Sequence, residues 1–474
     1  MSELVWKTAV ELSALINRGE VSATEVLQAH LDQIDALNPK LNAIVTYLPE
    51  MAQERARQAD EKQARGEELG LLHGLPIAHK DAFETEGIRT TWGSPVFSDY
   101  VPAADDLIIA RLKAAGCITL GKTNVPEFGA GSHTFNRVFG ATRNPYDLSR
   151  TCGGSSGGAA VALAAGMIPI ADGSDLGGSL RNPASFCNVV GLRPSPGRVP
   201  GYPKANAWET LGVAGPMGRT VQDVALMLAA IAGYDPRAPI SLAEPATVFA
   251  QPLERDFAAV KIAWSPDLGL LPVEPSVSAT IEKQLTVFSE LGCQVEEAAP
   301  DFRDAYDIFQ TLRAWSFELS FSEHFAEQGE ERFKETIRWN VAQGKRLTGA
   351  QVSRAEAKRT ELFQRVREFL DTYEFLLLPT AQTPPFLIEW EYPTQINGVA
   401  METYIDWMMS CAFITVTGMP AISVPCGFTD DGLPVGLQIV GRPRADFAVL
   451  QLAYAFQEAT RVYQHKPPIC QAQL

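Results

Sequence analysis

Short apolar runs, each about as long as a buried strand, alternate with helical segments along most of this 474-residue chain. The strand-like runs are 75–80, 117–120, 167–171, 260–264, 375–378, 421–425 and 435–440. The helical patterns are 106–115, 158–166 and 221–231, with another that starts at about residue 445. This alternation is typical of α/β proteins, in which helices cover a sheet. We therefore predict an α/β fold.

The first long helix has a recognisable start. Ser22 and Glu25 have the S-x-x-E form of a capping box, and apolar residues follow at helical spacing from Val26 to Leu37. We predict that this helix begins directly after Ser22.

The stretch 301–372 is helical in pattern and richer in charged and aromatic residues than its surroundings. No Pro/Ser-rich linker and no internal repeat divides the sequence. We therefore predict one large domain, 1–474, with its core motifs at about 70–200 and 375–441. In this interpretation 301–372 is a variable helical elaboration near the substrate pocket; an independent helical domain is the alternative.

The charge balance argues against nucleic acid as a partner. Forty Lys and Arg stand against 56 Asp and Glu, so the net charge is −16 at pH 7. An acidic protein repels phosphate backbones, and the sequence has no basic run. It also lacks a run of 18 apolar residues and a signal-peptide pattern, so we expect no membrane association.

Cysteine and histidine usage indicates a cytoplasmic protein without a metal. The seven cysteines are scattered, odd in number and without metal-ligand spacing, so we expect them to be reduced. The six histidines include no H-E-x-x-H pair.

Glycine and serine are concentrated in two nearby segments, 151–160 and 171–184. Glycine clusters allow positive φ and the close approach of a ligand to the backbone. The first segment opens a helix, and the positive potential at a helix N-terminus favours alkoxide character. These segments are therefore the strongest candidates for chemistry.

Several kinds of site could use these segments. A phosphate loop would need a lysine after the glycines, and none follows. A G-x-S-x-G nucleophile elbow is formally matched at 153–157 with Ser155 as the nucleophile. However, no apolar strand precedes it, and only His324 and His465 lie downstream as bases. Turns without any chemistry are a further alternative.

The remaining interpretation combines serine with a lysine base. A serine hydroxyl is a weak nucleophile that needs a base to accept its proton. Lys80 ends the apolar run 75–80, and burial there would lower its pKa from an ordinary value of about 10.4. A bridging hydroxyl could carry the proton between the two.

Lys80, the run G-G-S-S-G-G at 153–158 and the run G-S-D-L-G-G-S at 173–179 together resemble the amidase signature family, in order and in spacing. The resemblance extends over nearly the whole chain through matches at 121–124, Glu127, 191–194, 197–198, 420–425 and 432–441. It implies a single domain with a central twisted mixed β-sheet covered by helices on both faces.

The resemblance also implies a Ser–cis-Ser–Lys triad. Ser179 would be the nucleophile, Ser155 the bridging serine after a cis peptide bond from Gly154, and Lys80 the base. Loss of one oxyanion-hole donor typically costs about 3–4 kcal/mol. The backbone N–H groups expected to form the oxyanion hole are those of Leu176, Gly177, Gly178 and Ser179.

Three neighbouring residues are expected to support this machinery rather than to react. Ser156 would donate or accept a supporting hydrogen bond, Asp175 would brace its loop, and Arg181 would be structural. The family's reaction is acyl transfer through a serine acyl-enzyme, which needs no cofactor.

Two departures from one branch of the family bear on the substrate. The glutaminase subunit of glutamyl-tRNA amidotransferase has a threonine that touches glutamine where this chain has Leu176, and a tyrosine- and serine-rich stretch where it has 200–211. Both departures remove polar handles, and a charged substrate without a partner is costly in an apolar pocket. We therefore expect a small amide with an apolar or aromatic part.

Aromatic side chains are candidates for the pocket wall, although aromatics at helical spacing are equally typical of a core. The candidates are Trp92, Phe135, Tyr202, Trp208, Trp315 and Phe317. Gly129, Ala130 and Gly131 match a stretch that borders the substrate in the family.

The sequence thus predicts an amidohydrolase that cleaves the C–N bond of linear amides and gives acid plus amine. Aryl amides fit the same chemistry, and a carbamate- or ester-preferring hydrolase is one alternative. A glutaminase-type subunit of a glutamyl-tRNA amidotransferase complex is the other. Family members are commonly homodimers, so a homodimer is left open. The rate is expected to fall at acid pH as Lys80 becomes protonated.

Overall fold

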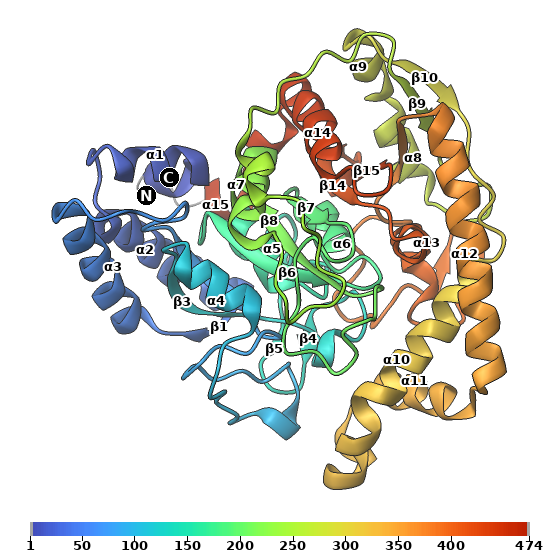
Figure 1. Ribbon diagram of the computed structural model, residues 1–474, viewed down its shortest axis with the longest axis horizontal. Helices are drawn as coiled ribbons and strands as arrows, with labels where there is room; N and C mark the ends of the chain where they lie inside the picture. The colour runs from blue at the N-terminus through green and yellow to red at the C-terminus, as the bar shows by residue number, and fades with distance from the viewer. Residues whose placement is uncertain (1–2, 472–474) are drawn as a thin grey trace.

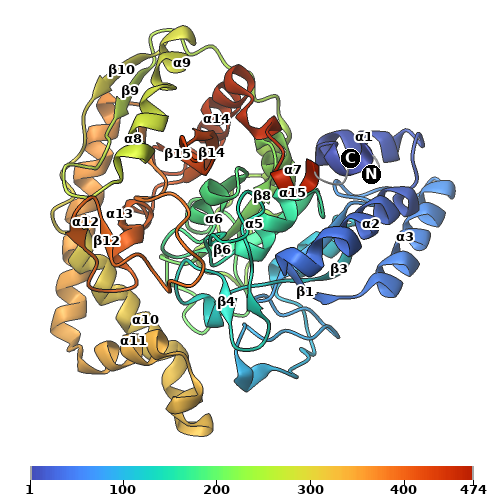
Figure 2. The same ribbon diagram turned by 180° about the vertical axis from the view of Figure 1, so that it is seen from behind.

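The structure, a computed structural model that describes residues 3–471, contains a large mixed β-sheet and a smaller sheet surrounded by helices (Figures 1 and 2). In spatial order the large sheet contains β10 (Gln294–Glu297), β9 (Lys261–Trp264), β11 (Phe375–Pro379), β15 (Pro434–Gly441), β14 (Ala421–Phe428), β7 (Val190–Arg193), β8 (Val213–Gly218) and β6 (Ile170–Asp175). Strand β9 runs parallel to β10 and β11, and the other neighbours are antiparallel. The predicted α/β class with a mixed sheet is confirmed.

The large sheet is covered on both faces, as the side chains of β11 show. Its side chains alternate between two apolar clusters, with Phe375 and Leu377 in one and Leu376 and Leu378 in the other. Successive side chains of a strand point to opposite faces, so a strand buried on both faces is apolar throughout. The first cluster includes residues of α7 (Val221–Ile231) and α14 (Asp446–Thr460), and the second residues of α10 (Ala305–Gln328), α12 (Gly349–Thr372) and α13 (Met409–Thr417).

The predicted strand at 75–80 lies outside the large sheet. It forms β2 (Pro76–Lys80) of a three-stranded sheet, parallel to β3 (Ile118–Thr123), whose other neighbour is the antiparallel β1 (Ile44–Tyr47). The backbone N–H of Lys80 donates to Asp172 on β6 at 2.7 Å, which ties the small sheet to the large one. Two short hairpins complete the strands: β4 (Phe135–Asn136) with β5 (Gly140–Ala141), and β12 (Gln395–Ile396) with β13 (Val399–Ala400).

The capping box at Ser22 is formed as predicted. The Ser22 hydroxyl accepts from the Glu25 backbone N–H, and the Glu25 carboxylate accepts from the Ser22 N–H. This box starts α2 (Ala23–Leu41). The remaining α-helices are α1 (Ala9–Asn17), α3 (Pro49–Ala64), α4 (Leu107–Ala114), α5 (Gly157–Ala164), α6 (Arg181–Phe186), α8 (Pro275–Glu282), α9 (Leu285–Glu290), α11 (Glu335–Arg346) and α15 (Pro468–Gln471). Short 3₁₀ turns are η1 (Glu3–Trp6), η2 (Pro95–Phe97), η3 (Glu127–Gly129), η4 (Ala246–Ala250), η5 (Glu330–Arg332), η6 (Asp406–Met408) and η7 (Val462–Gln464).

The stretch 301–372 folds into α10, α11 and α12, at the end of the molecule opposite α1–α3 (Figures 1 and 2). Residues of α10 and α12 pack in the same apolar cluster as β11, so these helices share a core with the large sheet. Within residues 3–471, no helix is long and apolar enough to cross a membrane.

Helix α5 is buried along its whole length, and a glycine permits this. A Cβ on Gly158 would lie 2.4 Å from the backbone N of Asn124 and 2.6 Å from the carbonyl oxygen of Ala43. Only a residue without a side chain lets the helix approach the small sheet so closely. The contact holds the serines that precede α5 beside the end of β2.

Candidate active site

Lys80, the last residue of β2, is fully buried and ends among three serine hydroxyls. Its Nζ lies 2.8 Å from Ser155 Oγ, 2.9 Å from Ser156 Oγ and 2.9 Å from Ser174 Oγ. Within the described part of the chain, no carboxylate oxygen lies within 4 Å of this nitrogen. Its neighbours are therefore neutral groups, and the hydroxyls among them can exchange protons with it.

Burial lowers the pKa of Lys80 to about 7, although the charges of Asp175 and Asp172 oppose the shift. A lysine with an ordinary pKa is almost entirely protonated at neutral pH and cannot accept a proton. Here a large fraction of Lys80 is neutral near pH 7. The site thus holds a base of suitable strength for neutral conditions.

Two buried residues, His79 and Asp172, hold the end of β2 that carries Lys80. Asp172 accepts the N–H of Lys80 and lies 2.5 Å from Nδ1 of His79. The other ring nitrogen of His79 lies 2.9 Å from the hydroxyl of Thr119 on β3. This network positions Lys80 without contacting its ammonium group.

Ser155 lies in the loop that leads into α5, and its peptide bond with Gly154 is cis, as the resemblance implies. Hydrogen bonds from neighbouring hydroxyls hold this loop: Thr134 donates to the carbonyl of Gly153 at 2.8 Å, and Ser132 donates to that of Gly154. The loop therefore presents the Ser155 hydroxyl in a fixed direction.

Ser179 lies in the turn between β6 and α6, and one backbone hydrogen bond joins this turn to the other serine loop. The N–H of Ser156 donates to the carbonyl of Ser179 at 3.1 Å. Ser179 is partly exposed, and in residues 3–471 its hydroxyl has no hydrogen-bond partner. The two loops are thus adjacent, and the Ser179 hydroxyl is the one left open to a ligand.

Asp175 braces the turn that carries Ser179. Its carboxylate accepts the N–H groups of Gly178 at 2.9 Å and Leu180 at 3.2 Å, and it forms ion pairs with Arg181 and Arg193. Burial alone would raise the pKa of Asp175, but the charges and hydrogen bonds of the two guanidinium groups outweigh burial and hold it well below its ordinary value. Asp175 is therefore a permanently charged brace.

The hydrogen bond between Asp175 and Gly178 changes the role expected for Gly178 in the oxyanion hole. The resemblance directs the N–H of Gly178 toward the substrate, but this group donates to Asp175, because the turn folds back on the carboxylate at the end of β6. A backbone N–H has a single hydrogen, so it is occupied here. The remaining candidates for the oxyanion hole are the N–H groups of Leu176, Gly177 and Ser179.

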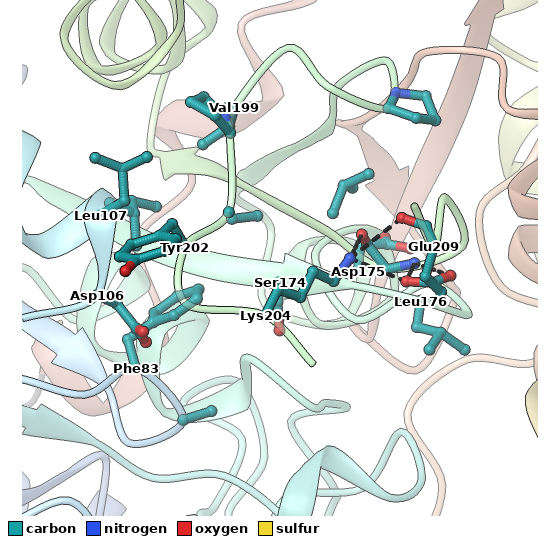
Figure 3. Close-up of a pocket in the computed structure, with 18 of the residues that line it drawn as sticks. Phe83, Asp106, Leu107, Ser174, Asp175, Leu176, Val199, Tyr202, Lys204 and Glu209 are labelled. Carbon is teal, nitrogen blue, oxygen red and sulfur yellow. Dashed lines mark hydrogen bonds and ion pairs between the residues drawn. The ribbon is translucent and has the colours of Figure 1, made fainter. Parts of the chain in front are cut away.

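A cavity of about 380 Å³ opens over the serine loops (Figure 3). Ser155, Ser174, Leu176 and Ser179 form its floor. Apolar and aromatic side chains from several elements contribute to its walls, including Phe83, Leu107, Phe128, Val199, Tyr202 and Phe317. A largely apolar hollow with a few convergent polar groups is the usual form of a small-molecule site.

The structure brings only some of the candidate substrate residues to this cavity. Gly129, Tyr202 and Phe317 line it, and a Cβ on Gly129 would lie 3.2 Å from Ser155 Oγ. Ala130 is fully buried behind this wall, in an apolar cluster with phenylalanines of α10. Gly131 lies against the ring of Tyr404, also outside the cavity lining.

Three tryptophans lie elsewhere than the sequence predicted. Trp92 packs in an aromatic cluster behind Phe128, 6.5 Å between ring centroids. Trp208 is 73% exposed on a surface loop, and Trp315 is 38% exposed on the outer face of α10, where the two border a separate hollow. Aromatic residue type alone could not tell a pocket wall from a second layer or a surface.

Phe135 is also outside the cavity, because its ring lies beneath the ammonium group of Lys334 at 4.4 Å. Ser174 and Arg313 are among the cavity residues that the sequence reasoning missed. Ser174 lies within the quoted run 173–179 and could have been found there, because it precedes Asp175 and must point to the opposite face of β6. Arg313 interrupts an aromatic stripe of α10 formed by Phe309 and Phe317, and a charged residue on an apolar face is a signal.

No cluster of three or more metal-ligating side chains occurs among residues 3–471, and all seven cysteines are free and buried. Ser155, Ser174 and Ser179 line the cavity, and Lys80 contacts Ser155, Ser156 and Ser174. Such a set of groups can supply a nucleophile, a hydroxyl relay and a base.

Comparisons with known proteins show the family of this chain. The family model described as "Amidase" matches residues 25–450. An acylamidase of Rhodococcus erythropolis is 36% identical over 98% of both chains, and a glutamyl-tRNA(Gln) amidotransferase subunit of Moorella thermoacetica is 37% identical over 98% of this chain and 99% of its own. The crystal structure of a bacterial aryl acylamidase matches with a TM-score of 0.91 at 31% identity, over 98% of both chains. The chain therefore belongs to the amidase signature family.

Proposed function

We propose that this protein hydrolyses carboxylic amides through a serine acyl-enzyme, with Ser179 as nucleophile, Ser155 as proton relay and Lys80 as base. The observation that carries the proposal is the fully buried lysine whose Nζ lies 2.8 Å from Ser155, at the floor of a cavity that also exposes Ser179. What makes this lysine suited to proton transfer is that two of the serine hydroxyls it contacts, Ser155 and Ser174, line the cavity.

In the proposed reaction the oxygen of Ser179 attacks the amide carbonyl as its proton passes to Ser155 and that of Ser155 passes to Lys80. The C–O bond forms, and the carbonyl oxygen takes up the negative charge, which the N–H groups of Leu176, Gly177 and Ser179 would stabilise. The protonated Lys80 returns its proton through Ser155 to the nitrogen, and the C–N bond breaks. Water then attacks the acyl-enzyme by the same relay, and the acid is released.

Ser156 and Ser174 would hold the lysine rather than react. Each lies 2.9 Å from Nζ, so the three serines fix the nitrogen from different directions. A fixed donor–acceptor geometry lowers the reorganisation needed during proton transfer.

The cavity favours a small amide with an apolar or aromatic part. Its floor carries Leu176, and its walls include Phe83, Phe128 and Phe317. The same acyl-enzyme chemistry would cleave aryl amides, and esters and carbamates are the alternatives within this proposal. A homodimer and a cytoplasmic location remain predictions.

A role as the glutaminase-type subunit of a glutamyl-tRNA amidotransferase is the second candidate, because the relative from Moorella thermoacetica shares 37% identity. The two candidates differ in what the purified chain does alone. A stand-alone hydrolase cleaves amides without ATP or a companion chain, whereas the second candidate predicts release of ammonia from glutamine and little other turnover.

The test is a steady-state assay of the purified chain with 4-nitroacetanilide, with other anilides, and with glutamine. We expect release of 4-nitroaniline, abolished by Ser179→Ala and Ser155→Ala and only weakened by Ser156→Ala. Glutaminase activity with no anilide cleavage would support the amidotransferase role instead. Turnover that survives Ser179→Ala would refute the proposed nucleophile.

A further inference from the structure

Arg313 is the only arginine that lines the cavity within the described residues, and it is 97% buried, because 3% of its surface is exposed. It lies on α10 between two aromatic residues of the same helix face, Phe309 and Phe317. Arginine is seldom buried without an anionic partner. The question is therefore which group balances this charge.

The protein itself supplies no anion to Arg313. Its Nη2 donates to the hydroxyl of Tyr404 at 2.8 Å, and its guanidinium carbon lies 4.3 Å from the ring centroid of Phe317. In residues 3–471 no carboxylate lies within 4 Å of the guanidinium group, and its buried Nε has no hydrogen-bond partner. The aromatic rings stabilise the cation only in part.

Two other cations near the cavity are neutralised, which sets Arg313 apart. Lys204 pairs with Glu209 at 3.0 Å, and Lys334 pairs with Glu391 at 2.8 Å. The charge of Arg313 also opposes protonation of the neighbouring Lys334. Among the described residues, Arg313 is therefore the cavity-lining cation without a carboxylate within 4 Å.

The position of Arg313 relative to the reaction follows from the helix. A Cβ on Gly177 would lie 3.0 Å from the ring of Phe309. Phe309 of α10 therefore packs against the turn that carries the expected oxyanion hole. Arg313 comes one turn later, a rise of about 6 Å along the axis. A group bound there would be separated from the scissile carbonyl by a short spacer.

We propose that Arg313 binds a carboxylate of the substrate, so that the preferred substrates are amides that carry an acidic group a few bonds away from the scissile bond. This inference rests on the proposed amide hydrolysis and names its substrate class. An arginine binds a carboxylate through planar, charge-assisted hydrogen bonds, which are stronger than neutral ones. The Phe317 and Tyr404 rings hold the guanidinium group in place for that contact.

The experiment compares acidic and neutral substrates of matched shape. For an acid on the acyl side, the 4-nitroanilide of succinic acid is compared with that of 4-oxopentanoic acid, in which a methyl ketone replaces the carboxylate. For an acid on the amine side, N-acetyl-4-aminobenzoate is compared with N-acetyl-4-aminoacetophenone. The quantity measured is the ratio of kcat/KM for acid over neutral in each pair.

We expect the wild-type protein to prefer the acid in at least one pair, and Arg313→Gln to reduce that ratio by about 10- to 100-fold, mainly through KM. Arg313→Lys keeps the charge but loses the planar fork, so it should retain part of the preference, and it also serves if Arg313→Gln does not fold. The control is Lys204→Gln, which removes a cation already neutralised by Glu209 and should change the ratio by less than about fivefold.

The outcomes separate this inference from the proposed function. If the neutral anilides are cleaved and the acid is preferred in neither pair, or if the preference survives in Arg313→Gln and Arg313→Lys, amide hydrolysis stands and the role of Arg313 is refuted. If neither the acid nor the neutral substrates are cleaved by the wild-type protein, the proposed function fails together with the inference.

Discussion

Two buried cationic centres lie on opposite sides of the last residues of β6. On one side Ser174 contacts Lys80, whose other close partners are hydroxyls. On the other side Asp175 forms ion pairs with Arg181 and Arg193. Adjacent residues of a strand point to opposite faces, so a single step along the chain separates the two centres.

The difference lies in what each cation contacts. A carboxylate in ion pairs with two guanidinium groups keeps all three charges fixed, because arginine does not lose its proton in proteins. A lysine among neutral hydroxyls has no fixed counter-charge in contact, so burial favours its neutral form. The arginine centre therefore holds the Ser179 turn, and the lysine centre is able to move protons.

The largest effect should come from removal of the lysine. We expect Lys80→Met to lower kcat/KM by at least about 10³-fold, because no other base contacts Ser155 within residues 3–471. The measurement is anilide hydrolysis per folded molecule, with folding checked by circular dichroism.

Lys122 on β3 is the matched control for that variant. It is also a buried lysine, its pKa is lowered by burial to about 8, and its Nζ contacts the carbonyl of Phe83 and the hydroxyls of Thr85 and Thr90 rather than any serine of the proposed site. Lys122→Met should lose stability but keep its turnover per folded molecule. Equal losses of activity in the two variants would show that the effect is not specific to Lys80, and the proposed distinction would be wrong.

Removal of the fixed charge should act mainly on stability. Asp175→Asn leaves Arg181 and Arg193 buried without their carboxylate, which we expect to cost about 3–5 kcal/mol of the free energy of unfolding. Denaturant titration measures this cost. The control is Asp371→Asn, which breaks an exposed pair with Arg367 and should cost no more than about 1 kcal/mol. Similar costs for both variants would contradict the role of Asp175 as a buried brace.

The pH dependence of kcat/KM should follow the titration of Lys80 rather than that of Asp175 and its two arginines. Because burial lowers the pKa of Lys80 to about 7, its neutral fraction grows as pH rises through that value. We expect kcat/KM to fall about tenfold for each pH unit well below 7 and to level off above it. A profile without an acidic limb between pH 5 and 7 would exclude Lys80 as the base.

The smallest effect should come from Ser174→Ala, which removes one of the three hydroxyls around Nζ. A hydroxyl acceptor stabilises the ammonium form, so its loss should move the acidic limb to lower pH and lower kcat by about 2- to 10-fold. A limb displaced to higher pH would mean that Ser174 favours the neutral lysine instead.

Local motifs predicted the parts of this molecule that depend on neighbours in sequence. The capping box at Ser22 needs only a side chain three residues away, and the helix starts there. The continuous apolar run of β11 follows from burial on both faces. The order of the motifs, with their resemblance to a family, led to the contact between Lys80 and Ser155.

Features that depend on distant segments could not be predicted. The N–H of Gly178 is occupied because the turn folds back on Asp175, a matter of backbone direction that residue types do not encode. Trp208 and Trp315 are aromatic but lie on the surface, and Arg313 is charged but buried. For Trp315 and Arg313 the position is set by which face of α10 packs against the cavity, and residue type alone does not reveal that face.

The most direct test of the account is labelling with a fluorophosphonate, a reagent selective for activated serines, followed by intact mass measurement and peptide mapping. We predict one adduct, on Ser179, in the wild-type protein and in Lys122→Met, and a rate of labelling that collapses in Lys80→Met. An adduct on Ser155, or labelling of Ser179 that is equally fast in Lys80→Met, would contradict activation of this serine by the buried lysine.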